Sequence, residues 1–131
     1  MPREVIGPVG SLPNGGTNPI SPAVRAGDFV FISGLMPKGA DGQMVDGDIA
    51  VQTVTVMDRL AGVLDSAGCD FSDVVKCTVW LTDSDDFEAF NNAYAPYFKG
   101  APPARSAVKS DLLLPSAKIE LEAICYKPVR G

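Results

Sequence analysis

From position 119 the chain reads Ile119-Glu120-Leu121-Glu122-Ala123-Ile124-Cys125-Tyr126, and its side chains change character at almost every step. Successive side chains of a β-strand point to opposite faces of a sheet, so this pattern predicts a strand from 118 to 126. One face would carry Ile119, Leu121, Ala123 and Cys125, and the other would carry the two carboxylates. The sequence therefore predicts a sheet with one face in the core and one face that the core does not cover.

Three further segments extend the predicted sheet. Residues 73–82 alternate in the same way, with Val75, Cys77, Val79 and Leu81 on one side. Residues 28–34 (DFVFISG) form a compact apolar run with aromatic and β-branched side chains, which is typical of a buried strand. A short strand is expected over 105–109, directly after the break that Pro102-Pro103 imposes.

Two segments instead have the period of a helix. Asp48 is a suitable N-cap for a helix that ends near Gly68, with one face made of Ala50, Val54, Met57, Ala61 and Leu64. Residues 83–86 offer capping side chains for a second helix, whose stripe of Phe87, Phe90, Tyr94 and Phe98 is interpreted as core packing. Pro96 conflicts with the last turn of that helix.

The predicted order of elements is β-α-β-α-β-β, and two helices are too few to cover both faces of such a sheet. We therefore predict an α+β fold with both helices packed on one face of the β-sheet. Residues 1–27, rich in Gly, Pro, Asn and Ser, are expected to form a loop-rich N-terminal segment with a possible edge strand. Residues 1–131 are expected to form a single domain.

Composition narrows the class of protein. The chain has 131 residues, of which 46% are hydrophobic and 21% charged, as in ordinary globular proteins. No apolar run approaches the ~20 residues that span a bilayer, and the first residues lack the apolar core of a signal peptide. Three cysteines, Cys69, Cys77 and Cys125, are an odd number without metal-site spacing, so a reducing compartment is expected. These features predict a cytoplasmic protein with no membrane partner and no metal.

Charge and the absence of histidine restrict the chemistry. The net charge is -5, yet residues 99–131 hold six basic and three acidic side chains. An acidic protein is a poor candidate for nucleic-acid binding, whereas a local basic pocket for a small anion remains compatible with this distribution. Without histidine, Ser-His-Asp and Cys-His catalysis are excluded, and acid-base work must fall to carboxylates, lysine, tyrosine, a thiol or a positioned water.

Five segments, in this order and spacing, resemble the RidA/YjgF family of reactive-intermediate imine deaminases, formerly called translation inhibitors or L-PSP endoribonucleases. They are GDFVFISG at 27–34, DVVKCTV at 73–79, FN at 90–91, PARS at 103–106 and IELEAI at 119–124. The resemblance implies a chorismate-mutase-like fold of the bacillary type. It also implies a homotrimer with three inward-facing sheets and ligand clefts between subunits.

The resemblance further implies hydrolytic deamination of a reactive 2-imino or enamine carboxylic acid to a 2-keto acid and ammonia, without a cofactor. In that scheme Arg105 grips the substrate carboxylate and Glu120 positions the attacking water. The rest of the small-molecule site would be lined by Ser33, Gly34, Asn91, Ser106 and Ala107. Without the resemblance, Arg105 would be interpreted as a surface arginine and Glu120 as part of a solvated strand face.

Three positions depart from the family pattern. Many imine-hydrolysing members have a tyrosine where Ala23 stands, a glutamine where Leu35 stands and a cysteine where Ala107 stands. Ala23 and Leu35 are therefore expected to line a roomier and less polar pocket. We hypothesise that the substrate is larger or more apolar than the smallest imines, such as an aminomuconate-like enamine.

Two other classes of function stay open at this point. The first is a non-catalytic protein that binds small carboxylates or regulates a partner. The second is an endoribonuclease, which the old family label suggests but which the acidic balance and the missing histidine weaken. The three cysteines are interpreted as small buried side chains, and Asn91 is equally explained by capping or by solvent exposure.

Overall fold

Six strands form one sheet with the order β1-β2-β3-β6-β4-β5 in the computed structural model, which describes residues 3–10 and 15–129. The strands are β1 (Glu4–Ile6), β2 (Ala23–Ala26), β3 (Phe29–Leu35), β4 (Val74–Leu81), β5 (Ala104–Lys109) and β6 (Ile119–Tyr126). The helices are α1 (Ile49–Ser66) and α2 (Phe87–Tyr94), with short 3₁₀ turns at Phe71–Asp73, Ser84–Asp86 and Ala95–Tyr97. None of the described helices is long and apolar enough to cross a bilayer.

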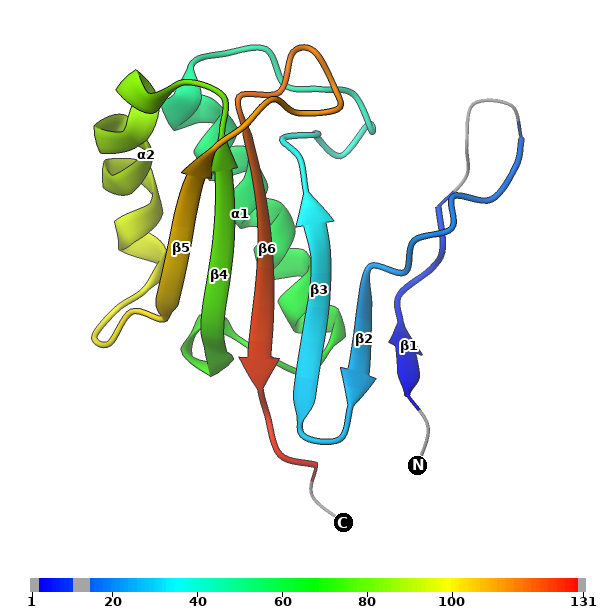
Figure 1. Cartoon of the computed structure of the whole chain (residues 1–131). Coiled ribbons are helices and arrows are strands. Elements are labelled where there is room, and N and C mark those ends of the chain that lie inside the picture. The colour runs from blue at the N-terminus through cyan, green and yellow to red at the C-terminus, as the bar shows by residue number, and fades with distance from the viewer. Residues whose placement is uncertain (1–2, 11–14, 130–131) are drawn as a thin grey trace.

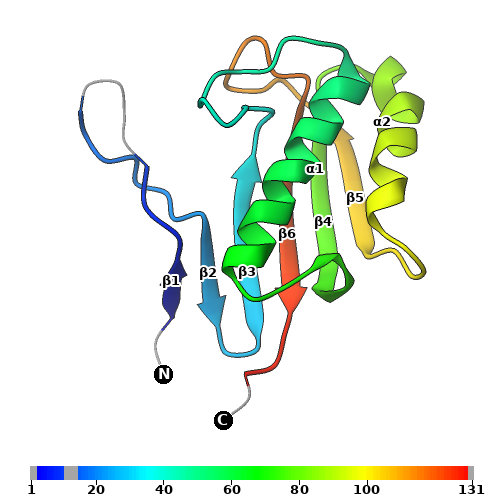
Figure 2. The same cartoon turned by 180° about the vertical axis from the view of Figure 1, so that it is seen from behind.

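Both helices lie on the same side of the sheet. Figure 1 looks onto the face that no helix covers, and Figure 2 shows α1 and α2 in front of the opposite face. Strand β6 is central and pairs antiparallel with β3 and β4, while β5 pairs parallel with β4 at one edge. The predicted α+β fold with helices on one face is therefore confirmed.

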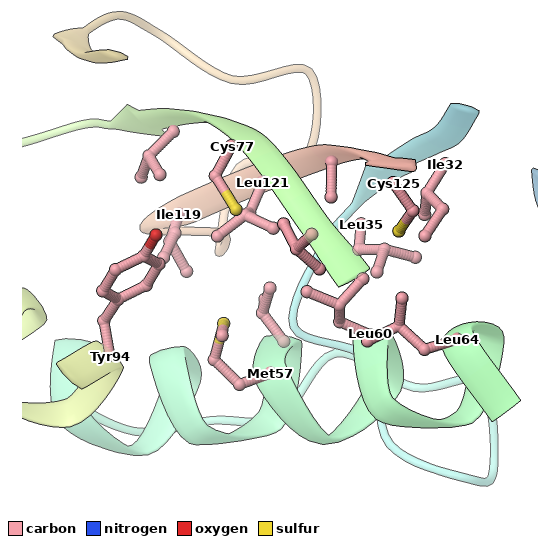
Figure 3. Close-up of a cluster of buried hydrophobic side chains, with 14 of the residues drawn as sticks. Ile32, Leu35, Met57, Leu60, Leu64, Cys77, Tyr94, Ile119, Leu121 and Cys125 are labelled. Carbon is pink, nitrogen blue, oxygen red and sulfur yellow. The ribbon is translucent and has the colours of Figure 1, made fainter. Parts of the chain in front are cut away.

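The alternation of β6 separates the core from the open face as predicted. Ile119, Leu121 and Cys125 are completely buried, and they contribute to the layer between the sheet and α1 that Figure 3 shows. One prediction for β4 was wrong: Val75 is 43% exposed. The pairing of β4 with β6 shifts register between Val74 and Lys76, and this irregularity interrupts the alternation at Val75.

Helix α1 begins as predicted, because the Asp48 carboxylate accepts a hydrogen bond of 3.0 Å from the backbone N–H of Val51. Its buried face differs from the predicted one, since Val54 is 42% exposed. The buried residues are Ile49, Gln52, Thr53, Val56, Met57, Leu60 and Leu64. Two polar side chains belong to this face, so apolar spacing alone placed the stripe at the wrong angle.

Helix α2 and the N-terminal segment also differ in detail from the sequence prediction. The α-helical part ends at Tyr94, and Pro96 lies in the following 3₁₀ turn, so Phe98 falls outside the helix. The segment 1–27 contributes two strands, β1 and β2, where one possible edge strand was expected. Residues 1–2 and 11–14 of that segment lie outside the described residues.

A buried glutamine fixes the start of β6. The side-chain amide nitrogen of Gln52 on α1 donates to the carbonyls of Val45 (3.1 Å) and Ser116 (3.0 Å). Its oxygen accepts from the backbone N–H of Lys118 at 2.8 Å. Gln52 is 1% exposed, so these three bonds tie the loops before α1 and before β6 to the helix.

We predict that Gln52→Leu lowers the free energy of unfolding by about 2–4 kcal/mol, because three backbone groups lose their partner inside the protein. Chemical denaturation followed by circular dichroism measures this change. The matched control is Gln43→Leu at an exposed position, which should stay within about 0.5 kcal/mol of the wild type. Equal effects of the two variants would contradict the role assigned to Gln52.

Candidate active site

Arg105 lies on the helix-covered side of the sheet, at its edge. Strand β5 pairs parallel with β4 so that Arg105 is opposite Cys77, whose side chain is completely buried in the core. The guanidinium accordingly points toward α2, where its Nη1 donates a hydrogen bond of 2.7 Å to Oδ1 of Asn91. This bond shows that Asn91 orients Arg105. Neither of the two explanations offered by the sequence, capping or solvent exposure, includes this contact.

Three aromatic rings of α2 surround the same guanidinium. Its Cζ atom lies 5.6 Å from the ring centroid of Phe87, 5.3 Å from that of Phe90 and 5.1 Å from that of Tyr94. Such cation–π contacts are worth about 0.5–2 kcal/mol each, more when water is excluded. Phe90 and Tyr94 are core residues as predicted, but Phe87 is 43% exposed. The aromatic stripe therefore also holds Arg105.

The hydroxyl of Tyr94 reaches the sheet beneath Arg105. Figure 3 shows its ring extending from α2 toward the strands. Among the described residues its oxygen is buried without a hydrogen-bond partner. Burial, followed by the neighbouring Cys77 thiol, raises the pKa of Tyr94, and burial also raises the pKa of Cys77. All three cysteines are free and buried, which confirms their interpretation as small buried side chains.

Glu120 projects from the other face of the sheet. It pairs with Trp80 of β4 and lies between the buried residues Ile119 and Leu121, so its side chain is on the open face. Burial, and next the charge of Glu122, raise the pKa of Glu120 above the ordinary value of 4.5. The carboxylate lies against Gly34 of β3, where an added Cβ would overlap its Oε2 atom.

A β-bulge places Gly34 under this carboxylate. In the pairing of β3 with β6, Ile32 is opposite Ala123 and Leu35 is opposite Leu121, so β3 has one extra residue between them. Ser33 Oγ donates a hydrogen bond of 2.6 Å to the carbonyl of Ser21 and holds the bulge in place. The groove in front of it, which we call the Glu120 groove, has a volume of about 550 Å³. Its lining includes Ser33, Gly34, Leu35, Lys38, Arg59 and Glu120.

Arg59 of α1 is a cation of the Glu120 groove that sequence reasoning missed. Its Nη1 donates a hydrogen bond of 2.6 Å to the carbonyl of Met36, and burial lowers its pKa. No carboxylate of the described residues forms an ion pair with it. The only signal in the sequence was its spacing: Arg59 lies three positions after Val56 of the buried face, so a cation was to be expected beside that face of α1.

The predicted site residues fall into two groups on opposite faces of one chain. Arg105, Asn91 and Ala107 lie at the β5 edge on the helix-covered face, where Ala107 lines an edge pocket of about 280 Å³. Glu120, Ser33, Gly34 and Leu35 meet at the Glu120 groove.

Two predicted residues join neither group. Ser106 pairs with Thr78 and points away from Arg105, and Ala23 is completely buried and lines neither hollow. No set of three or more potential metal ligands converges within the described part of the chain.

The family is established by comparison with known proteins. A family model described as endoribonuclease L-PSP matches residues 14–127. The chain belongs to this family. It is 39% identical over 112 residues to the 2-iminobutanoate/2-iminopropanoate deaminase of Mus musculus, covering 83% of this chain and 82% of the relative.

Two further relatives extend over nearly the whole chain. The 3-aminoacrylate deaminase RutC of Acinetobacter baylyi is 35% identical over 127 residues, 96% of this chain and 99% of the relative. The crystal structure of E. coli TdcF with bound serine superposes with a TM-score of 0.83 at 27% identity, covering 95% of this chain and 98% of that one. The family thus includes imine and enamine deaminases, and one structural neighbour holds a small amino acid.

We predict that Gly34→Ala displaces the Glu120 carboxylate while leaving the fold intact, because the overlapping atom is the end of a flexible side chain. The pKa of Glu120, followed by NMR of a labelled carboxyl group, should change. Thermal unfolding should move by a few degrees at most. The matched control is Gly62→Ala on α1, where an added Cβ meets no atom within 4 Å. An unchanged Glu120 titration in Gly34→Ala would contradict the close packing.

Proposed function

We propose that this protein hydrolyses reactive 2-imino or enamine carboxylic acids to 2-keto acids and ammonia, without a cofactor, at sites formed between the copies of a homotrimer. The observation that carries the proposal is the guanidinium of Arg105, held by Asn91 and three aromatic rings at the edge of the sheet. The relatives named as deaminases at 35–39% identity support the reaction class.

Arg105 binds the substrate carboxylate in this proposal. One N–H of Nη1 is engaged by Asn91, and the planar guanidinium retains a pair of N–H donors for two parallel bonds to a carboxylate. The aromatic rings fix the plane of the guanidinium without competing for its donors. The carboxylate is thus presented in one orientation, which fixes the adjacent imine carbon.

Hydrolysis then requires one water and one proton acceptor. Glu120 accepts a proton from the water while the water oxygen forms a bond to the imine carbon. The π-electron pair of the C=N bond moves to the nitrogen. The nitrogen takes up the proton held by Glu120 and then the proton of the new hydroxyl group, so that the C–N bond breaks, ammonia leaves and the hydroxyl oxygen becomes the keto oxygen. The raised pKa of Glu120 suits this exchange, because a stronger base accepts the proton of water more readily.

The two groups require a second copy of the chain to meet. Arg105 and Glu120 lie on opposite faces of one sheet, so a substrate on Arg105 cannot contact Glu120 of the same chain. A neighbouring copy that packs its open face against the β5 edge would bring its Glu120 groove to Arg105. The reacting carbon would then lie between groups from two subunits.

The open face has the apolar surface that such packing needs. Phe29, Phe31 and Tyr126 lie on it at 42–45% exposure, and their rings contact one another, with centroids 6.5 Å apart for the two phenylalanines and 5.2 Å apart for Phe29 and Tyr126. Exposed clusters of large apolar side chains mark interaction surfaces. This aromatic cluster supports a homotrimer with inward-facing sheets.

We predict that Arg105→Ala lowers kcat/KM for imine hydrolysis by at least about a hundredfold, and that Arg105→Lys recovers only part of it. Glu120→Gln should lower kcat by about a hundredfold to ten-thousandfold. Ammonia release from freshly generated imines measures both.

The pH dependence follows from the raised pKa of Glu120. Activity should fall as pH drops through a midpoint above 4.5, because the acceptor becomes protonated there. A carboxyl group whose pKa is raised by folding stabilises the protein at low pH and loses this contribution as pH rises through the folded-state value. Glu120→Gln should therefore unfold at a higher temperature than the wild type at pH 7, with the difference vanishing in acid. A less stable Glu120→Gln would contradict the assigned environment.

A mixing experiment tests whether the site is shared. Arg105→Ala and Glu120→Gln chains, each inactive alone, are co-expressed with different tags so that mixed trimers form. In each mixed trimer one of the three interfaces combines an intact Arg105 with an intact Glu120, so mixed trimers purified through both tags should recover about a third of the wild-type activity. No recovery in verified mixed trimers would mean that the site does not draw these residues from two copies.

We predict that Phe31→Glu dissociates the homotrimer, because a buried unpaired carboxylate would replace an aromatic ring at the interface. Sedimentation velocity measures the assembly. The matched control, Val54→Glu, changes a similarly exposed apolar residue on the helical side and should leave the assembly unchanged. Dissociation by both variants, or by neither, would argue against the open face as the interface.

Two other functions are decided by the same reagents. Carboxylate binding that Arg105→Ala abolishes, in a wild type without imine hydrolysis, would favour a non-catalytic binding or regulatory protein. The family description also names an endoribonuclease. The net charge of -5 and the lack of histidine weigh against it, and RNA cleavage that survives purification but is lost in Glu120→Ala would favour it.

A further inference from the structure

An apolar hollow lies along the end of β5, on the strand that also carries Arg105. This edge pocket has a volume of about 280 Å³ and is lined by Leu81, Ser84, Phe87, Ala107, Val108 and Lys109. Its size is close to the lower end of the range for small-molecule sites, about 300–1,000 Å³. It lies between the start of α2 and the end of β5, whereas Asn91 and Arg105 face each other farther along the same two elements.

Phe87 contacts both the edge pocket and Arg105, and both lie on the helix-covered side of the sheet. The Phe87 ring lines the pocket and lies 5.6 Å from the Arg105 guanidinium carbon. Ala107 pairs with the buried Val79, so it points to the same side of the sheet as Arg105, two residues away. Two residues of a strand span about 7 Å, which is the reach of a short alkyl chain.

We propose that the edge pocket receives the side chain of the substrate whose carboxylate Arg105 binds. The substrate class is then 2-imino acids with an uncharged, apolar side chain of about three to five carbons, the length that spans two residues of a strand. This inference rests on the proposed deaminase function and specifies its substrate.

The lining selects for an uncharged side chain. Leu81, Phe87 and Ala107 offer apolar walls. Ser84 of the lining belongs to a turn that is rich in carboxylates, namely Asp83, Asp85 and Asp86. These carboxylates repel a second anionic group of the ligand. Lys109 is a single exposed cation at the rim and does not offset them.

Ala107 sets the free space of the edge pocket. It is the only residue of β5 that points to the helix-covered face between Arg105 and Lys109, and it contributes a single methyl group there. A larger side chain at this position would fill the part of the pocket that the ligand side chain would otherwise occupy. Ala107 lies outside the hydrophobic core of the chain, so a larger residue there does not require the core to repack.

The test uses the stable 2-keto acid products as probes of the wild-type protein. Isothermal titration calorimetry compares pyruvate, 2-oxobutanoate, 2-oxopentanoate and 2-oxohexanoate, with 2-oxoglutarate as the dianionic probe. Each added methylene should lower Kd by about fourfold, as expected for a buried CH₂. 2-Oxoglutarate should bind more weakly than 2-oxopentanoate.

Two variants then place the effect in the edge pocket. Ala107→Leu should remove most of the gain with chain length, so that the ratio of Kd between pyruvate and 2-oxohexanoate falls at least tenfold. Ser84→Phe, at the mouth of the same pocket, should lower this ratio in the same direction. Ala101→Leu makes the same alanine-to-leucine change at an exposed position outside the pocket and should leave the ratio unchanged.

The outcomes separate this inference from the proposed function. A Kd that is independent of chain length, or a gain that survives in Ala107→Leu, overturns the role of the edge pocket. Tightest binding of 2-oxoglutarate overturns the uncharged class in favour of a second carboxylate at Lys109. A chain-length gain lost in Ala107→Leu, in a protein without imine hydrolysis, would support the pocket and refute the deaminase.

Discussion

Helices cover only one face of the six-stranded sheet, and the central strand β6 presents apolar side chains to them at every second position. The core therefore depends on the alternation of side chains along β6, which places Glu120 and Glu122 on the open face. Shifting β6 by one residue would move both carboxylates into the layer that α1 covers, at a cost of several kcal/mol for each unpaired charge. The position of the acidic group is thus fixed by the same constraint that builds the core.

The position of Arg105 follows from a second strand pairing, that of β5 with β4. Because β5 pairs with β4 in parallel, Arg105 shares a side with the buried Cys77 and meets the aromatic face of α2. As an edge strand, β5 has no neighbour beyond it, so Arg105 can be reached from outside the sheet. Glu120, in contrast, projects from the open face and lines the Glu120 groove. The fold itself keeps the two groups apart, which is why the proposed reaction uses groups from two copies of the chain.

The sequence predicted the parts that rest on local periodicity, namely α1 with its Asp48 cap, the central strand and the sidedness of Glu120. It did not predict features that arise from pairing between distant strands. The bulge at Ser33-Gly34 and the irregularity at Val75 exist only against β6, and whether Arg105 shares a face with Glu120 depends on two registers that no single segment encodes. The family motif indicated Arg105 and Glu120 without indicating their faces. The contact of Asn91 with Arg105 likewise required the packing of α2 on β5.

The chain has no histidine, and the base of the proposed reaction is the carboxylate of Glu120, whose ordinary pKa is too low to accept a proton readily at neutral pH. Partial burial already raises the pKa of Glu120 in the single chain. In the proposed trimer a second copy would remove further water from the open face, and desolvation would raise this pKa again. Assembly would then strengthen the base in the same step that brings Arg105 to the substrate. In the monomer, then, Arg105 and Glu120 do not meet at one site and Glu120 is also the weaker base, so activity should follow the trimer concentration more steeply than carboxylate binding does.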